Sequence, residues 1–421
     1  MTYLIAFINL LVLGCVAGSI YNRQPDNMKP LYRTALVVKL LAGFAVGWLY
    51  FYYYGEGDTI TYWQDGKIVS DLIMDNPSGA LRFFWNENAD PELLPGLINL
   101  QQRSLFFAKI SGILSLLTSG NYWLMSILIS SVSFLGAWYI FRRVTDFFPS
   151  SDQAAALSFL FFPSVVFWSS GLIKESLGLA SIFFLTAIFL NLCQYKKVKW
   201  GDGVLIILSL WIGWNLKYYW IGVFVPVILT TAIIIRLKHS FVFFQRFDGA
   251  SWVVLFVIIF LTGTSIHPNF YPNRFLEVIV ENNREFMLLT YPDNAVHYND
   301  LSATFGSVLM NSPQALVAGF FRPFIWEGHH IISVAAGVEN TVLLILFITS
   351  IISIKRFFSS PDRLMALAAI AYCVVLGIFL ALSTPNFGTL SRYKIGFLPF
   401  LVFLTVYKNP FVNKMTGLAG R

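Results

Sequence analysis

The first candidate for a catalytic residue along this sequence is a carboxylate, Asp58. Asp58 lies in GEGDTITYW (residues 55–63), directly after an apolar run, preceded by glycines and followed by aromatic residues. A partly desolvated carboxylate in such a place can act as a general base or hold a divalent cation. Three further acids of this region are interpreted as a solvated acidic face, namely Asp65, Asp71 and Asp75.

An adjacent cation and carboxylate form the second constellation. The run FFPSVVFWSSGLIKESLG (residues 161–178) contains Pro163, which bends a helix, and ends its first apolar part in a Ser-Ser-Gly turn. Lys174 and Glu175 follow that turn at the start of the next apolar run. Ionisable residues at such depth usually line a cavity. The alternative is a short turn with a snorkelling lysine.

Four more cations adjoin apolar runs. Arg392 and Lys394 lie in STPNFGTLSRYKIGFLPF (residues 383–400), Lys217 lies in NLKYYW, and Arg322 lies in FFRPFIWEGHH. Cations in these positions suit an anionic group at a membrane surface, such as a lipid phosphate. The alternative for Arg392 and Lys394 is an interfacial anchor together with Tyr393.

The histidines and cysteines of the sequence do not predict a metal site or a disulfide framework. His329 and His330, with Glu327 beside them, do not predict a metal site, because adjacent His rings point apart and no third ligand has matching spacing. The three cysteines lie in or beside apolar runs without a CxxC spacing, so they are expected to be small packing residues.

The elements that position these residues are membrane spans. Of 421 residues, 57% are hydrophobic and 12% charged, which excludes a soluble globular enzyme and a disordered chain. The apolar runs predict an all-α, polytopic helix bundle of roughly eleven spans. The runs fall at 3–20, 34–54, 121–141, 153–172, 176–194, 203–217, 218–236, 252–265, 338–354, 364–383 and 395–408.

Loop charge predicts the orientation. One set of alternate loops holds 17 Lys and Arg against six acids, and the positive-inside rule places that set in the cytoplasm. Eleven spans then put the N terminus outside and the C terminus in the cytoplasm. The net charge of +7 has its source in these loops and does not indicate nucleic acid. No basic region precedes residues 3–20, so a cleaved signal peptide is not expected there.

The long loops lie on the outer face, and function is expected there. We predict one transmembrane domain over 1–421, with a first outer loop at 55–120 and a second at 266–337. Segment 104–119 reads as an interfacial or re-entrant helix. Segment 266–311 is expected to act partly as a lid; the alternative is a passive connector with a short helix at about 273–289.

The pattern resembles a known superfamily. G-D-x-x-x-Y (57–62), outer cations and a late R-Y-x-x-x-x-x-P (392–399) resemble the GT-C membrane glycosyltransferases, which use lipid-phosphate-linked sugars on the extracytoplasmic face. PSVVFWSSGLIKE (163–175) is similar to a motif of bacterial polytopic proteins, often from Bacteroidota, associated with surface-glycan assembly. FRPFIWE (321–327) is a further short match. The chain departs from the best-known members in lacking D-E-x-x-Y and W-W-D-Y-G motifs.

The resemblance implies a function and a location. A polyprenyl-phosphate-linked sugar would be transferred to a glycan or protein acceptor, in the bilayer of a bacterial inner membrane, with a periplasmic N terminus. Asp58 takes the place of the base or metal-binding carboxylate, and Arg392 that of the arginine on the donor phosphate. Glu175 joins Asp58 as a catalytic candidate. Asp58, Lys174, Glu175 and Arg392 are also expected to converge on one outer-facing cavity, because each lies at a similar membrane depth beside aromatic, Gly or Ser residues. The expected substrate-binding residues are Lys174, Lys217, Arg322, Arg392, Lys394 and Tyr62.

Other functions stay open. A glycan polymerase or a protein O-glycosyltransferase of the same fold would use the same residues. A flippase for a lipid-linked oligosaccharide would also need cations for phosphate, although transporters often show repeated halves and pairs of broken helices, and the sequence shows no internal repeat. A non-catalytic scaffold would explain neither the Lys174–Glu175 turn nor the outer arginines.

Overall fold

The computed structural model describes residues 2–86, 95–265, 268–352 and 362–415. These residues form helices without a strand, apart from one isolated β-bridge between Ala295 and Asn386. The chain divides into two compact units, each built from more than one stretch of sequence. Unit 1 comprises residues 1–147, 159–190 and 197–218, and unit 2 comprises residues 148–158, 191–196 and 219–421.

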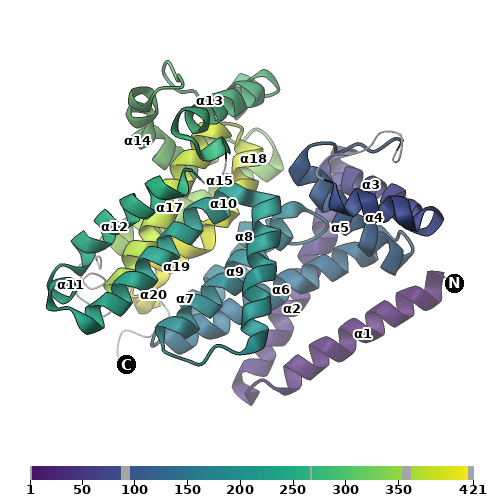
Figure 1. The fold of residues 1–421 in the computed structure, drawn as a ribbon, viewed down its shortest axis with the longest axis horizontal. Coiled ribbons are helices and arrows are strands. Elements are labelled where there is room, and N and C mark those ends of the chain that lie inside the picture. The colour runs from purple at the N-terminus through teal and green to yellow at the C-terminus, as the bar shows by residue number, and fades with distance from the viewer. Residues whose placement is uncertain (1, 87–94, 266–267, 353–361, 416–421) are drawn as a thin grey trace. The chain divides into compact units, whose positions relative to one another are not determined.

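Unit 1 is a bundle of long apolar helices joined to a group of shorter ones (Figure 1). A turn of π-helix ends α2, and Gly55, with φ of 74°, ends that turn in the left-handed region. Its elements are α1 (Thr2–Asn22), η1 (Asp26–Met28), α2 (Lys29–Trp48), η2 (Leu49–Tyr54), α3 (Asp58–Asp75), α4 (Pro77–Trp85), α5 (Gln102–Thr118), α6 (Tyr122–Phe147), α8 (Pro163–Trp168) and most of α9 (Lys174–Cys193).

Helices α3 and α5 pack against each other through glycines. A Cβ on Gly66 would lie 2.9 Å from the carbonyl oxygen of Ser111, and a Cβ on Gly112 would clash with Val69. The two backbones therefore approach more closely than larger residues would allow. Within the expected outer loop 55–120, the helix predicted at 104–119 is present as α5, and the described residues contain two further helices, α3 and α4.

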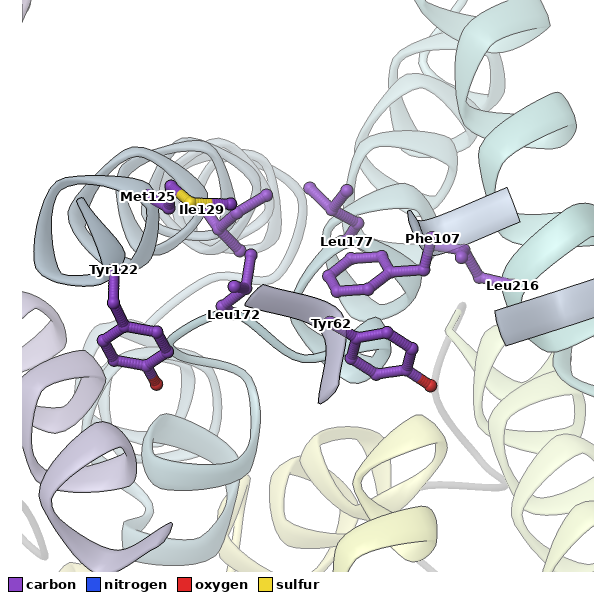
Figure 2. Packing of buried hydrophobic residues seen from close by; sticks show 8 residues of the cluster. All are labelled: Tyr62, Phe107, Tyr122, Met125, Ile129, Leu172, Leu177 and Leu216. Carbon is purple, nitrogen blue, oxygen red and sulfur yellow. The ribbon is translucent and has the colours of Figure 1, made fainter. Parts of the chain in front are cut away.

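A hydrophobic core joins these helices to the rest of unit 1. Figure 2 shows the Tyr62 ring beside the Phe107 ring, with Leu177 of α9 next to them. The two ring centroids are 4.7 Å apart in an edge-to-face arrangement, which is a favoured geometry for aromatic pairs. This core places one face of α3 and α5 against the start of α9.

Unit 2 has a core of aromatic residues around its last helices. The Tyr372 hydroxyl donates to the Gly396 carbonyl at 3.1 Å, and Trp220 packs closely against Gly396. Its elements are α7 (Asp152–Ala156), α11 (Val242–Arg246), α12 (Asp248–Gly263), η4 (Pro268–Phe270), α13 (Pro272–Leu288), η5 (Pro292–Asn294), α14 (Phe305–Phe321), η6 (Ile325–Glu327), α15 (Ile331–Ile351), α17 (Arg363–Ser383), α18 (Phe387–Tyr393), η7 (Lys394–Gly396), α19 (Leu398–Val406) and α20 (Pro410–Met415).

Three elements cross the boundary between the units. Helix α9 does so near its end, after Leu190. The π-helical η3 (Leu157–Phe161) does so near its start. The long α10 (Trp200–Ser240) is kinked at Lys217, where φ is −145° and ψ is 58°, and the boundary follows Tyr218. The runs 203–217 and 218–236 therefore correspond to two helical segments that meet at the non-helical Lys217, where the sequence placed the break between them.

The described residues include seven helices that are long and apolar enough to cross a membrane, or eight if one bent pair counts as a span. This number of long apolar helices indicates a multi-pass membrane protein. The bent pair joins residues 387–396 to α19 at an angle of 71°. The seven are residues 3–22, 26–54, 122–147, 174–193, 200–240, 331–351 and 363–383.

This count differs from the expected eleven for local reasons. Run 153–172 breaks at Pro163 into short pieces, because proline cannot continue the preceding helix. Run 252–265 forms only the 16-residue α12, and run 395–408 belongs to the bent pair. The orientation of the termini stays a prediction. Lys355 and Arg356, two of its loop cations, lie outside the described residues.

Candidate functional site

A turn at the start of α9 positions the Lys174–Glu175 pair. Residues 169–173 leave the helix, and Gly171 has a φ of 78°, a conformation that favours glycine. The Gly171 N–H donates to Ser130 Oγ at 2.9 Å, and Ser176 Oγ donates to the Gly171 carbonyl at 2.9 Å. Buried hydroxyls therefore satisfy the backbone groups that this helix break frees.

Lys174 reaches the N-terminal end of α5. Its Nζ donates to Ser104 Oγ at 3.0 Å and lies 5.4 Å from the centre of the Tyr62 ring. The Tyr62 hydroxyl donates to the same Ser104 Oγ at 3.3 Å. Lys174 and Tyr62, which the sequence analysis proposed as site residues, therefore share a hydrogen-bond partner. That partner, Ser104, was not among the proposed residues.

Glu175 forms a buried ion pair with Lys217. Glu175 Oε1 and Lys217 Nζ are 2.7 Å apart, and the two side chains are 1% and 2% exposed. The residues are 42 positions apart in sequence, and the non-helical backbone at Lys217 forms part of this site. Glu175 therefore holds a cation in place, which favours a positioning role over the expected catalytic one.

Asp58 and Arg103 complete the cluster. Both lie near enough to Lys174 to act on its charge, as do Lys217 and Glu175. Asp58 is half-buried at the first turn of α3, and the Arg103 guanidinium lies 5.5 Å from the centre of the Tyr218 ring. Three cations face two carboxylates here, which leaves one net positive charge. We call these five residues the unit 1 cluster.

Lys39 is a buried cation that the sequence reasoning missed. It lies in the middle of α2, is 5% exposed, and donates to Ser169 Oγ in the turn before α9. A lone lysine inside the apolar run 34–54 was the available signal, since ionisable residues inside spans are costly and usually functional.

In unit 2 the Arg322 guanidinium is held by a carboxylate. Arg322 Nε donates to Glu327 Oε1 at 2.9 Å, and Nη2 donates to the same oxygen. The Phe324 N–H donates to Glu327 Oε2 at 2.8 Å, and Phe387 packs under the guanidinium at 4.9 Å. A phosphate at Arg322 would therefore compete with Glu327.

The late cations of unit 2 differ in burial. Lys394 is 1% exposed, and its amine donates to Asn340 Oδ1, while Asn340 Nδ2 donates to the Pro323 carbonyl at 2.9 Å. Arg392 is half-buried over the ring of Tyr393. Lys394 is thus part of an interior network rather than of a membrane surface. The convergence of Arg392 with Asp58, in the other unit, stays a prediction.

The expected lid is fastened to the end of α17. Asn283 Nδ2 donates to the Leu382 carbonyl at 2.6 Å, and the Tyr298 hydroxyl donates to the Ala381 carbonyl at 2.9 Å. The helix at about 273–289 that belonged to the alternative, a passive connector, is present as α13. Residues 266–267 lie outside the described part of the segment, and closure over Asp58 stays a prediction.

The prediction that Asp65 belongs to a solvated acidic face is wrong. Asp65 is fully buried and accepts hydrogen bonds from the backbone N–H groups of Ile98 and Asn99, at 2.8 and 3.0 Å, and from Asn99 Nδ2 at 2.7 Å. It ties α3 to the segment before α5. Asp71 and Asp75 are exposed, as expected.

A metal site has no ready set of ligands in the residues that the structure describes. No three His, Cys, Asp or Glu side chains gather there, and His329 and His330 are exposed. The unit 1 cluster instead pairs carboxylates with cations, an arrangement suited to an anionic ligand.

The unit 1 cluster brings together five of the eight residues that the sequence proposed, either as members or, for Tyr62, as the ring beneath Lys174. The remaining three, Arg322, Arg392 and Lys394, lie in unit 2. The chain matches no protein-family model, no curated protein and no solved structure. The site's own chemistry is therefore the ground for any assignment of function.

Proposed function

We propose that this chain is a membrane glycosyltransferase that takes a sugar from a polyprenyl-phosphate-linked donor. The observation that carries the proposal is the unit 1 cluster, in which two carboxylates, Asp58 and Glu175, and two further cations, Lys217 and Arg103, lie near Lys174. Its net positive charge suits the donor phosphate, and the apolar helices around it suit a lipid-linked substrate.

The chemistry divides among the cluster residues. The acceptor hydroxyl oxygen attacks the anomeric carbon of the sugar while the bond from that carbon to the phosphate oxygen breaks. Asp58 takes the hydroxyl proton, and the polyprenyl phosphate leaves with the bonding electron pair. Lys174 and Arg103 stabilise the charge on the leaving phosphate, and Glu175 keeps Lys217 in position beside them.

The test is Asp58→Asn in the full chain, in proteoliposomes supplied with a lipid-linked sugar. The substitution keeps the shape and removes the base, so transfer should fall by about 10²-fold or more while donor binding persists. Asp71→Asn, at an exposed position of the same helix, is the matched control. Near-normal transfer by Asp58→Asn would remove this residue from the catalytic role.

Lys174→Met and Arg392→Ala test the phosphate contacts. Each removes a charge-assisted contact expected to contribute roughly 1.5–3 kcal/mol, so donor binding should weaken by about 10-fold or more along with the rate. If Lys174→Met alone weakens binding, the phosphate lies at the unit 1 cluster. If only Arg392→Ala does so, the donor site belongs to unit 2.

A transporter of lipid-linked oligosaccharide is the second candidate, because the structure contains broken helices. The backbone leaves the helix at residues 169–173 and at Lys217, and the α18–α19 pair bends by 71°. Discontinuous helices often form the substrate sites of transporters. A labelled lipid-linked sugar that crosses the bilayer without transfer, equally in the parent and in Asp58→Asn, would favour this function.

A further inference from the structure

The corner between α10 and α12 holds an apolar pocket that the proposed function does not use. The short α11 connects the two helices there (Figure 1). The Phe241 N–H donates to the Leu237 carbonyl at 2.9 Å, and Gln245 Nε2 donates to the Lys238 carbonyl at 2.9 Å. These bonds fold α11 back onto the end of α10.

The pocket has a volume of about 580 Å³ and an almost purely hydrocarbon wall. Ile233 and Leu237 of α10, Phe244 of α11 and Val254 of α12 lie in its lining. A wall of this kind cannot orient a polar molecule by hydrogen bonds. The part of a ligand that enters it is therefore a hydrocarbon chain.

Cations surround the same corner. Asp248 accepts ion pairs from Lys238 at 2.7 Å and from Arg363 at 2.6 Å, so one carboxylate serves two cations. Arg236 and Arg246 are exposed, and each lies against an aromatic ring, Tyr195 and Phe247 respectively. Lys238 and Arg363 are thus paired with a carboxylate, whereas Arg236 and Arg246 present exposed guanidinium groups.

The short helix itself has the character of a membrane-surface element. Val242 and Phe243 are 76% and 61% exposed, next to the exposed Arg246. Exposed apolar side chains beside arginine are typical of helices that lie at the boundary between head groups and acyl chains. The apolar pocket and the exposed arginines therefore belong to the same two consecutive helices, α10 and α11.

We propose that this corner binds an anionic phospholipid, with an acyl chain in the apolar pocket and the head-group phosphate at Arg236 and Arg246. The charge rule assigns the same loop to the cytoplasmic leaflet, where anionic lipids concentrate. The site is independent of the proposed glycosyltransferase activity, since none of its residues belongs to the unit 1 cluster.

The experiment is native mass spectrometry of the full chain in detergent, titrated with phosphatidylglycerol or with phosphatidylcholine of the same acyl chains. The parent should retain phosphatidylglycerol at least about 10-fold more tightly, because two exposed arginines contact its charge. The double variant Arg236→Gln/Arg246→Gln should bind both lipids alike. The matched control is Arg23→Gln/Arg33→Gln, in another loop predicted to be cytoplasmic.

Blocking the pocket tests the acyl-chain half of the site. Ala250→Phe should lower retention of both lipids, since it places a ring in the pocket, whereas Ala335→Phe, at an exposed position of α15, should not. If Ala250→Phe loses its cooperative thermal unfolding, Ser251→Phe replaces it. Equal retention of the two lipids by the parent, full retention by the blocked variant, or displacement of phosphatidylglycerol by equimolar polyprenyl phosphate would each overturn the proposal.

Discussion

Breaking the Glu175–Lys217 ion pair should have a large effect on stability. Both side chains are almost fully buried, and their charged atoms are 2.7 Å apart. At an effective dielectric constant of about 20, the Coulomb attraction at that distance is about 6 kcal/mol. Burial of the two charges opposes part of this attraction, so the pair itself adds little net stability.

The single variant Glu175→Gln leaves the Lys217 charge buried without its carboxylate. Such a loss typically costs about 3–5 kcal/mol of unfolding free energy. The double variant Glu175→Gln/Lys217→Met removes the unpaired charge, and it should recover most of that loss. The stability of the double variant relative to the two singles therefore measures the coupling between the residues.

The measurement is unfolding of the full chain in mixed micelles with increasing SDS, for the parent, both singles and the double. Lys238→Met is a useful comparison, because Asp248 keeps a second partner in Arg363 and the cost should be smaller. If Glu175→Gln is as stable as the parent, or the double variant is less stable than both singles, the buried pair does not exist as described.

Three further outcomes follow from single contacts. Asp65→Ala should expose the Ile98 and Asn99 amides to faster hydrogen exchange, because it removes three hydrogen bonds to a carboxylate, each worth about 1.5–3 kcal/mol. Gly66→Ala should lower stability by about 1–3 kcal/mol in the same SDS titration, since its Cβ would meet the neighbouring helix at 2.9 Å, whereas Gly14→Ala should not. Lys39→Met should preserve the thermal melting of the chain yet lower transfer, because an ionisable residue inside an apolar helix is usually functional; unchanged transfer would contradict this role.

The positions of the continuous apolar runs in the sequence predicted many of the long helices. The runs 3–20, 121–141 and 364–383 correspond to α1, α6 and α17, because a helix is the form in which an apolar segment can satisfy its backbone in a membrane. The helix that the alternative to a lid placed at about 273–289 also forms, as α13. Helix boundaries were predicted less well where the sequence stays apolar across a break in the helix, as at Pro163.

Contacts between distant residues could not be predicted in the same way. Nothing in the spacing of Glu175 and Lys217 indicates that they pair, since the contact depends on how α9 and α10 lie in unit 1. Asp65 looked like its acidic neighbours because composition does not reveal which carboxylate will face a backbone segment. The proximity of Asp58 to Lys174 was anticipated from their similar position beside apolar runs, without a contact to support it.

The hydrogen bonds to Asp65 also determine when this region can finish folding during protein synthesis. Its partner Asn99 lies 34 residues later in the chain. At a translation rate of about 5–20 residues per second, the carboxylate waits about 2–7 seconds for the amides that will enclose it. Until then α3 carries a carboxyl group without these partners on the face that later becomes interior. Folding of this region therefore finishes only after residues 98 and 99 have been made, and a ribosome stalled earlier would hold α3 incompletely packed.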